Sequence, residues 1–386
     1  MTFHTGPAPR LRLATAPAGG TPPDARRQAL EQAVDYAVRA PSVHNTQPWR
    51  FELKPDRLVI RADRTRQLTT LDPIGRELVQ SVGAALFNAR VALAARGWAA
   101  ETDRLPVHDD PDVLAVVRPV PGSPDAGLAM LAPTVHRRRM NRRRFTGGHV
   151  PDEVVRRLTE IAEREGVLLV PVVHESHRRL VARLTQQADR LQNADPAYRA
   201  ELRTWTTRAR GEGDGVPAAA VPHVDGKEHD DVPLRDFDTT GAGALPAATH
   251  SGTDQTLVVL ASRSDDQYAC LRAGEALERL LLELTRLGWA ASPVTQAVEV
   301  PRTRSQLRSA LTGSAHPQNV LRIGVAAPGP PTPRRRRSTV VENSTRPPEP
   351  PVEPPPAGPT GWPVAGPAGP SGRRPVTDGR GGTTWL

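Results

Sequence analysis

Cysteine and lysine are almost absent from this chain. Cys270 is the single cysteine among 386 residues, which excludes a disulfide within the chain and a metal site made only of cysteines. A reducing compartment is therefore expected, and the cytoplasm is the predicted location. Only Lys54 and Lys227 are lysines, so arginine carries nearly all of the positive charge.

Long apolar stretches are missing as well. No run of about 18 apolar residues occurs, as a membrane-spanning helix would need, so no membrane association is predicted. Residues 1–24 hold no apolar core of signal-peptide length and are predicted to be a flexible N-terminus. Residues 342–386 are rich in proline, glycine and arginine, and have too few apolar side chains to offset the entropy of ordering. They are predicted to be a disordered tail.

Aromatic residues make up only 4% of the chain, although its net charge is +9. Proteins that bind single-stranded nucleic acids stack bases on aromatic side chains, so a nucleic-acid partner is unlikely by composition. The charge is also concentrated, because residues 137–144 contain six arginines and the tail contains several more. Binding of RNA or another polyanion through this cluster and the tail is therefore kept as the third hypothesis for function.

Helix and strand signals occur in two successions, which place a first half at residues 25–130 and a second half at 131–341. The first half is predicted to contain helices over 24–41 and 83–97 and strands over 49–53, 58–62 and 113–117. The second is predicted to contain helices over 151–166 and 176–191 and around 274, and strands over 167–173, 256–261 and 320–325. The polar segment 193–253 is too long for an ordinary connection, which predicts a lid-like insertion or a disordered one.

An internal repeat relates the two halves. Gly83, Ala85, Leu86, Gly97, Trp98, Ala99 and Ala100 recur as Gly274, Ala276, Leu277, Gly288, Trp289, Ala290 and Ala291, always 191 positions later (274 − 83). Chance similarity between two alanine-rich helices is the alternative. A tandem duplication predicts that the halves pack as a pseudo-two-fold pair, as the two chains of a homodimer do.

A polar loop follows the first predicted helix. It contains the candidate binding residues Ser42, His44, Asn45 and Gln47 between two prolines, which restrict the backbone. Such side chains supply neutral hydrogen-bond donors and acceptors, which suit the pyrimidine edge and ribityl hydroxyls of a flavin. The alternative is an ordinary loop in which these side chains only cap turns.

The arginine cluster forms a second constellation, which reads HRRRMNRRRF from residue 136 to 145. Its candidate residues are Arg139, Asn141, Arg142 and Arg143, because guanidinium forks beside an amide match a phosphate group in geometry and charge. A solvated charge run is the alternative. The apolar residues Met140 and Phe145 favour a segment held within the fold.

These motifs carry a family resemblance. Residues 40–49 resemble the Ala-Pro-Ser-x-x-Asn-x-Gln-Pro-Trp signature of the FMN-dependent nitroreductase superfamily, and residues 139–145 are similar to the Arg-x-Ser-x-Arg-x-Phe start of those enzymes, with asparagine in place of serine. The reversed order of the two motifs, with Asp-Pro-x-Gly-Arg-Glu at 72–77 and Thr-Pro-Arg-Arg at 332–335, resembles the Acg subfamily of fused FMN-binding proteins. The resemblance covers about residues 24–341.

The resemblance implies an α+β, nitroreductase-like fold in which two tandem related halves form a pseudo-dimer within one chain, so a monomer is expected. It implies one complete FMN site, between the polar loop of the first half and the arginines of the second, and a second site that is incomplete. Residues 292–296 stand where the family has a Pro-x-Glu-Gly turn beside the flavin, which adds Pro293, Thr295 and Gln296 to the predicted site. Arg335 is added as a phosphate ligand, with Arg334 as its alternative.

The implied function is that of an oxidoreductase in which hydride passes from NAD(P)H to FMN and on to a nitroaromatic or quinone-type acceptor. FMN would do the chemistry, so no catalytic side chain and no metal ligand are predicted. The alternative is an FMN-binding or storage protein with little turnover, because segment 193–253 could act as a lid over the flavin and because Thr295 and Gln296 depart from the family pattern.

Overall fold

The computed structural model describes residues 23–142, 145, 149–208, 210–217, 220, 232, 235, 237, 255–327, 329–343, 375–377 and 383–385. Residues 1–22, most of the predicted tail and much of segment 193–253 lie outside this described part. The chain divides into the unit Met1–Val352 and a short unit, Glu353–Leu386. In the short unit, β10 (Pro375–Thr377) pairs with β11 (Thr383–Trp385) in antiparallel fashion.

The first half is built on an antiparallel sheet with the strand order β3-β4-β2-β1. Its elements are α1 (Pro23–Ala37), β1 (Trp49–Leu53), β2 (Leu58–Ala62), α2 (Arg76–Ala95), β3 (Ala99–Arg104), β4 (Val113–Val120), α3 (Ala126–Ala129) and α4 (Ala132–Val135). The bounds of β1 and β2 are those predicted from the sequence. The predicted start of α2 at Gly83 is wrong, because the polar residues from Arg76 onward are helical and buried against the second half. Strand β3 was not predicted, since four of its six residues are polar and three are exposed.

The second half is built on a sheet with the strand order β5-β6-β8-β7. Its elements are α5 (Asp152–Arg164), β5 (Leu168–Pro171), α6 (Glu175–Ala194), α7 (Pro196–Thr206), β6 (Thr256–Ser262), α8 (Gln267–Leu287), β7 (Ala290–Pro293), α9 (Gln296–Glu299), α10 (Pro301–Leu307) and β8 (His316–Gly324). Alternate residues of β6 face opposite layers: Val258 and Leu260 pack with α5 and α8, and Leu257 and Val259 pack with α6, α9 and α10. Strand β6 is apolar throughout because both of its faces are covered.

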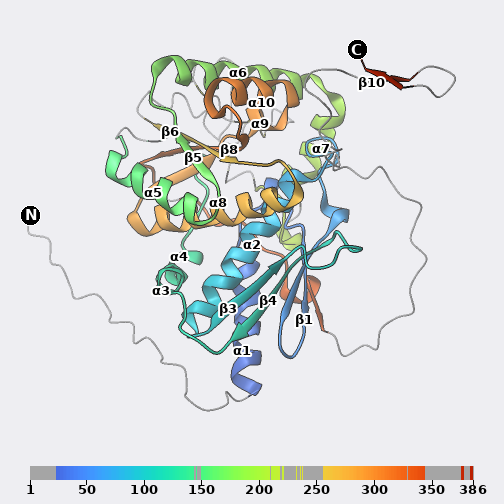
Figure 1. Ribbon diagram of the computed structural model, residues 1–386, viewed down its shortest axis with the longest axis vertical. Helices are drawn as coiled ribbons and strands as arrows, with labels where there is room; N and C mark the ends of the chain where they lie inside the picture. Colours follow the sequence, from blue (N-terminus) through green and yellow to red (C-terminus); the bar gives the residue numbers. More distant parts are fainter. Residues whose placement is uncertain are drawn as a thin grey trace, which may run out of the picture. The chain divides into compact units, whose positions relative to one another are not determined.

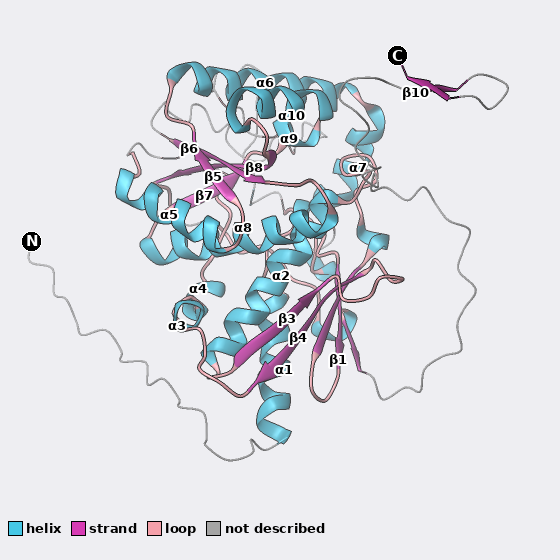
Figure 2. Ribbon diagram, in the orientation of Figure 1, coloured by secondary structure: helices cyan, strands magenta, loops and turns pink. Residues whose placement is uncertain are grey.

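The repeat seen in the sequence is a repeat of structure. The order β3-β4-β2-β1 corresponds strand by strand to β7-β8-β6-β5, α1 to α5, and α2 to α8. Figures 1 and 2 show α2 and α8 between the two sheets. The predicted pairing of the halves as a pseudo-dimer is therefore confirmed.

The two repeat glycines mark the point where α2 crosses α8. A Cβ atom on Gly83 would overlap the carbonyl oxygen of Leu271 and would lie 3.1 Å from the Cα of Gly274. A Cβ atom on Gly274 would overlap the carbonyl oxygen of Gln80. Leu271 is the repeat equivalent of Gln80, so the contact is reciprocal, as at a two-fold interface. Only glycine allows these backbones to approach so closely.

The C-terminal end of the second half completes the sheet of the first. Strand β9 (Val341–Asn343) pairs in parallel with β1, next to Phe51 and Leu53. The predicted boundary at residue 341 therefore falls within a strand that belongs to the first sheet. This exchange brings residues 331–340 alongside the polar loop of the first half.

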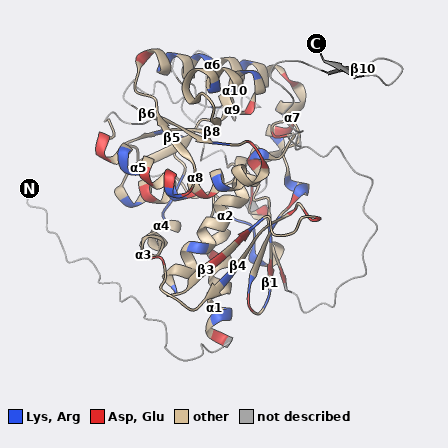
Figure 3. Cartoon of the chain, viewed as in Figure 1, with Lys and Arg blue, Asp and Glu red and all other residues tan. Residues whose placement is uncertain are grey.

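Among the described residues, one helix, α2, is long and apolar enough to span a membrane. Of its apolar stretch, 89% is buried inside the fold, as in the core helix of a globular protein. Its partner α8 carries charged residues of both signs, which are visible in Figure 3.

Candidate functional site

A cavity of about 120 Å³ lies between the two halves. The first half contributes residues 41–44 of the polar loop and one face of α2. The second half contributes Met140, Arg142, residues 292–296 at the end of β7, and Asn319 of β8. Of the predicted site residues, Ser42, His44, Arg142, Pro293, Thr295 and Gln296 line this cavity. The tertiary structure thus brings together residues that are up to about 250 positions apart in the sequence.

The polar loop has a constrained backbone. His44, Asn45 and Gln47 adopt positive φ angles of 44°, 56° and 51°, which non-glycine residues rarely adopt. The hydroxyl of Ser42 accepts a hydrogen bond from the Gln47 amide at 2.9 Å and closes the turn. Backbone strain of this kind persists where surrounding contacts hold it, and it concentrates at functional sites.

Asn45 and Gln47 point away from the cavity and hold other segments in place. The amide of Asn45 donates to the carbonyl oxygens of Gly215, at 2.9 Å, and of Pro333, at 3.1 Å. The amide of Gln47 donates to the Gly213 carbonyl at 2.8 Å, and its oxygen accepts from the backbone of Arg335 at 2.9 Å. These two side chains therefore tie segment 193–253 and residues 331–340, the C-terminal arm, to the loop.

The arginine cluster is divided between the interior and the surface. Arg138 is 4% exposed and lies 3.2 Å from the carboxylate of Glu278. Arg139 is partly exposed and donates to the carbonyl oxygens of His136 and Arg138. Asn141 is buried and donates to the Ala327 carbonyl at 2.6 Å. Arg143 lies outside the described residues.

Arg142 is one of two described arginines, with Arg235, that line the cavity. Burial, together with the neighbouring charges of Arg138 and Arg235, lowers its pKa to about 10. Its guanidinium lies 5.6 Å from the ring centre of Phe237, and no carboxylate among the described residues is within ion-pair range. A partly buried cation without a paired carboxylate favours an anionic or electron-rich ligand.

A second, larger cavity of about 930 Å³ lies between the end of α1, residues 208–217 and residues 330–337. Arg39, Arg334, Arg335 and Arg337 line it together with His136. Burial and the charges of Arg138, Arg39 and Arg139 lower the pKa of Arg334 to about 9. Arg335, the predicted phosphate ligand, is thus found here, beside the polar loop but outside the first cavity.

Two residues of segment 193–253 line the first cavity, and sequence reasoning missed both. Arg235 donates to the Glu299 carboxylate at 2.6 Å and to the Thr295 hydroxyl at 3.2 Å, and it also bonds the Tyr198 hydroxyl. Phe237 places its ring edge-on to His44, with 5.5 Å between ring centres. Within a polar, glycine-rich and proline-rich segment, no periodic pattern distinguishes these positions.

The comparisons with known proteins agree with this architecture. No family model matches the chain. The "Putative NAD(P)H nitroreductase Rv3131" of Mycobacterium tuberculosis (strain ATCC 25618 / H37Rv) is 37% identical over 325 residues, which cover 83% of this chain and 92% of that protein. The chain belongs to the NAD(P)H nitroreductase family. The "Putative NAD(P)H nitroreductase acg" of the same strain is 31% identical over 314 residues, which cover 79% of this chain and 93% of the relative.

A solved structure shows a weaker similarity to this nitroreductase. The FMN-dependent nitroreductase NfnB from Mycobacterium smegmatis in complex with NADPH is 16% identical and matches with a TM-score of 0.34. The match covers 56% of this chain and 99% of that one. The family relationship and the repeated topology of the two halves confirm the predicted α+β nitroreductase fold.

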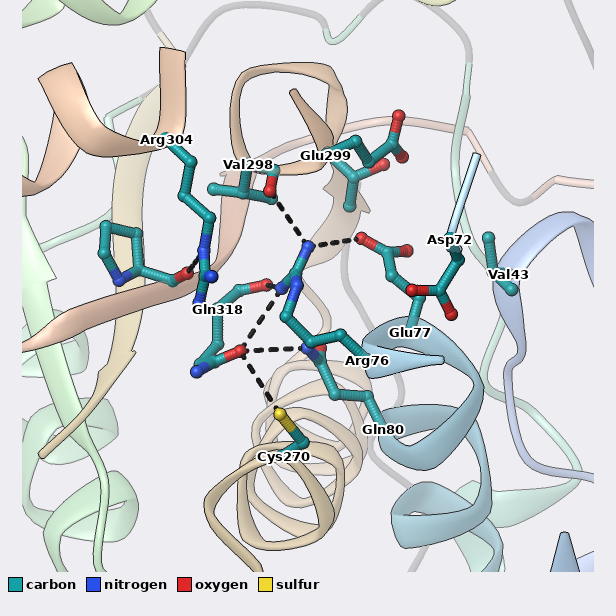
Figure 4. A network of polar contacts seen from close by, with 12 residues as sticks. Val43, Asp72, Arg76, Glu77, Gln80, Cys270, Val298, Glu299, Arg304 and Gln318 are labelled. Carbon is teal, nitrogen blue, oxygen red and sulfur yellow. Dashed lines mark hydrogen bonds and ion pairs between the residues drawn. The ribbon is translucent and has the colours of Figure 1, made fainter. Parts of the chain in front are cut away.

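The nitroreductase cavity also contains one carboxyl group, Glu77 in the first turn of α2. Figure 4 shows it beside Arg76, whose guanidinium donates to Glu77 at 3.0 Å, to the Gln318 carbonyl at 2.9 Å and to the Val298 carbonyl at 3.0 Å. Burial and the neighbouring Glu299 raise the pKa of Glu77 to about 8. This residue was not predicted, because the motif around it gives no indication that it faces a cavity.

The equivalent place on the other side of the pseudo-two-fold axis is filled with ion pairs. The repeat offset of 191 relates three cavity-lining residues to three charged ones: Ser81 to Arg272, Ala84 to Glu275, and Thr295 to Arg104. Arg104 and Arg272 lie 2.6 Å and 3.0 Å from Glu275, and Arg272 also lies 3.2 Å from Glu165. Paired, bulky side chains therefore stand where the first site has small ones.

Proposed function

We propose that this nitroreductase binds FMN between its halves and acts as an NAD(P)H-dependent oxidoreductase on nitroaromatic or quinone-type acceptors. The observation that carries the proposal is the meeting, around one cavity, of the neutral loop at Ser42 and His44 with Arg142 and with residues 292–296. FMN, when bound, supplies the hydride-transfer chemistry, and NAD(P)H is the expected donor. The complementary place across the pseudo-two-fold axis is filled, so one FMN per chain is expected.

Orphaned polar atoms support the fit of a flavin. Both ring nitrogens of His44, the Gln296 amide nitrogen and the Asn319 amide oxygen are buried, with no hydrogen-bond partner among the described residues. All three residues line the first cavity. Burial lowers the pKa of His44 to about 3, so its imidazole is neutral and offers one donor and one acceptor. A heterocycle with alternating donors and acceptors would satisfy these atoms.

The phosphate of FMN is proposed to lie toward the second cavity. Arg39 and Arg139 both lower the pKa of Arg334, which lines this cavity together with Arg39. Five arginines but only two aspartates are among the described residues that line the cavity, so the positive charges are not balanced. A phosphate would remove this repulsion. Arg335 and the undescribed Arg143 remain proposed phosphate ligands.

Replacing Arg142 with alanine tests the proposal. The variant should bind FMN roughly 10-fold to 100-fold more weakly, because a charge-assisted hydrogen bond contributes about 1.5–3 kcal/mol. Absorbance or fluorescence titration of the flavin-free protein measures the affinity. Arg137→Ala is the matched control, because Arg137 is exposed on the same segment. Equal FMN affinity in the two variants would contradict the assignment of Arg142.

A storage protein with a closed lid is the second candidate, favoured by Arg235 and Phe237. The cavity of about 120 Å³ is smaller than the roughly 300–1,000 Å³ usual for ligand sites. A flavin therefore requires that these two residues move. Under this alternative, NADPH would not bleach the colour of the FMN-loaded wild type.

Phe237→Ala should release the closed segment. The variant loses the ring contacts with His44 and Arg142, which contribute about 1 kcal/mol or more together, while the Arg235 ion pair stays. We expect FMN association to be roughly tenfold faster. Stopped-flow mixing of flavin-free protein with FMN measures the rate, and the exposed Tyr268→Phe serves as control. A rate equal to that of the control would show that Phe237 does not restrict entry.

The polyanion hypothesis is disfavoured by the burial of Arg138 and the cavity position of Arg142. Two of the six clustered arginines thus contribute little to an outer basic surface. A colourless protein that binds a generic oligonucleotide with a steep salt dependence would favour it instead.

A further inference from the structure

We propose that Glu77 donates the proton that accompanies hydride transfer to the acceptor. The proposal rests on the proposed function. Two-electron reduction of a quinone to a hydroquinone consumes one hydride and one proton. Reduction of a nitro group to a nitroso group consumes the same and releases one water. The hydride originates from NAD(P)H, and the carboxyl group of Glu77 supplies the proton and is reprotonated by water.

The composition of the cavity wall leaves few other donors. Glu77 is the one carboxyl group among the described residues that line the first cavity. His44 is neutral above about pH 3 and cannot act as an imidazolium acid. The remaining polar groups of the wall are amides, hydroxyls and the guanidinium groups of Arg142 and Arg235. None of these releases a proton readily near neutral pH.

The position of Glu77 suits a proton donor. Its side chain is 7% exposed and contacts the cavity, so a small acceptor in the cavity could reach it. Oε1 accepts the bond from Arg76, which leaves Oε2 to hold a proton. Arg76 already has two backbone carbonyl partners, so Glu77 is not needed to satisfy that guanidinium.

Comparison of the two repeats shows whether the fold itself requires a carboxyl group at position 77. The repeat equivalent of Glu77 is Tyr268 (77 + 191), which is 49% exposed. The fold of the repeat therefore does not demand a carboxyl group in this turn of the helix. The acid occurs in the half where the cavity is open, and not in its counterpart.

The charges around Glu77 keep its proton bound near neutral pH. Burial, Glu299 of α9 and Asp72 raise its pKa, Arg76 and Arg235 lower it, and the net result is a pKa of about 8. Compared with an unfolded chain, in which the pKa is near 4.5, the folded state holds an extra proton between these two values. The stability that this proton contributes is complete below about pH 4.5 and is lost as the pH rises through about 8.

Glu77→Gln tests the inference in the FMN-loaded protein. The variant should bind FMN as the wild type does and accept hydride from NADPH at a similar rate. Its reoxidation by a quinone should be roughly 100-fold slower, as for loss of a general acid, and independent of pH. Wild-type reoxidation should slow as the pH rises through about 8. Stopped-flow absorbance measures the two half-reactions separately, with Tyr268→Phe as the matched control.

A measurement without cofactor complements the kinetics. The difference between the denaturation midpoints of flavin-free wild type and flavin-free Glu77→Gln should change with pH. The wild type should lose stability relative to the variant as the pH rises from 5 to 8. A pH-independent difference, or equal reoxidation profiles in FMN-loaded wild type and variant, would overturn the role of Glu77. If Glu77→Gln does not fold, Glu77→Asp takes its place and should keep the pH dependence at a reduced rate; a pH-independent rate would overturn the inference. Failure of wild type to bind FMN would instead overturn the proposed function.

Discussion

Glu275→Ala should lower the free energy of unfolding by about 3–5 kcal/mol, the usual cost of breaking a buried ion pair from one side. Glu275 is fully buried, and its carboxylate lies 2.7 Å from Arg90 and 2.6 Å from Arg104. Burial alone would raise the pKa of Glu275, but the surrounding arginines lower it. The variant leaves the mostly buried Arg104 without its carboxylate and leaves Arg90 with only the longer contact to Glu165, at 3.4 Å.

Urea unfolding at pH 7 measures this effect. Glu175→Ala is the control, because Glu175 pairs with Arg179 on the surface, where both side chains are more than half exposed. That pair should contribute less than about 1 kcal/mol. Because the pKa of Glu275 is lowered by folding, its contribution is present above about pH 4.5 and is lost as the pH falls further. Equal losses of unfolding free energy in the two variants at pH 7 would show that the buried ion pairs around Glu275 do not stabilise the fold.

Gly274→Ala should destabilise the pairing of the two halves. The added methyl group overlaps the Gln80 carbonyl oxygen, so the backbones of α2 and α8 must separate. We expect a net loss of about 1–3 kcal/mol, even though alanine favours a helix over glycine by about 1 kcal/mol. Because α2 and α8 both line the first cavity, FMN affinity should fall as well.

Thermal or urea unfolding and flavin titration measure the two consequences of Gly274→Ala. Gly83→Ala should behave alike, since the contact is reciprocal across the pseudo-two-fold axis. Gly211→Ala serves as control, because nothing lies within 4 Å of a Cβ atom there. A stabilised Gly274→Ala protein would mean that the two helices do not depend on this close approach.

The sequence predicted those features of the structure that depend on residues close together in the chain. Strands β1 and β2 have the predicted bounds, since alternating apolar residues and a short turn specify a hairpin locally. The repeat of Gly83 and Gly274 was readable because identical residues recur at one constant offset, whereas the reason for the two glycines, the close crossing of α2 and α8, came from the structure. The motif around Ser42 and His44 was readable because its residues are consecutive.

Tertiary structure decided which of these residues meet. Asn45 and Gln47 belong to the same motif as Ser42, yet their side chains bond residues 213–215 and the C-terminal arm and do not line the cavity. Their proposed contacts with FMN remain predictions. Arg335 reaches the loop because β9 crosses to the sheet of the first half, a strand exchange that no local pattern encodes.

The amino-acid sequence alone determined the family resemblance, the duplication and the half of the chain that supplies each motif. The positions of Glu77, Arg235 and Phe237 in the cavity wall came only from the three-dimensional arrangement. The physical reason is that burial and charge pairing depend on groups far apart in the chain. Glu299, for example, raises the pKa of Glu77 across more than 200 residues of sequence because α2 and α9 both border one cavity.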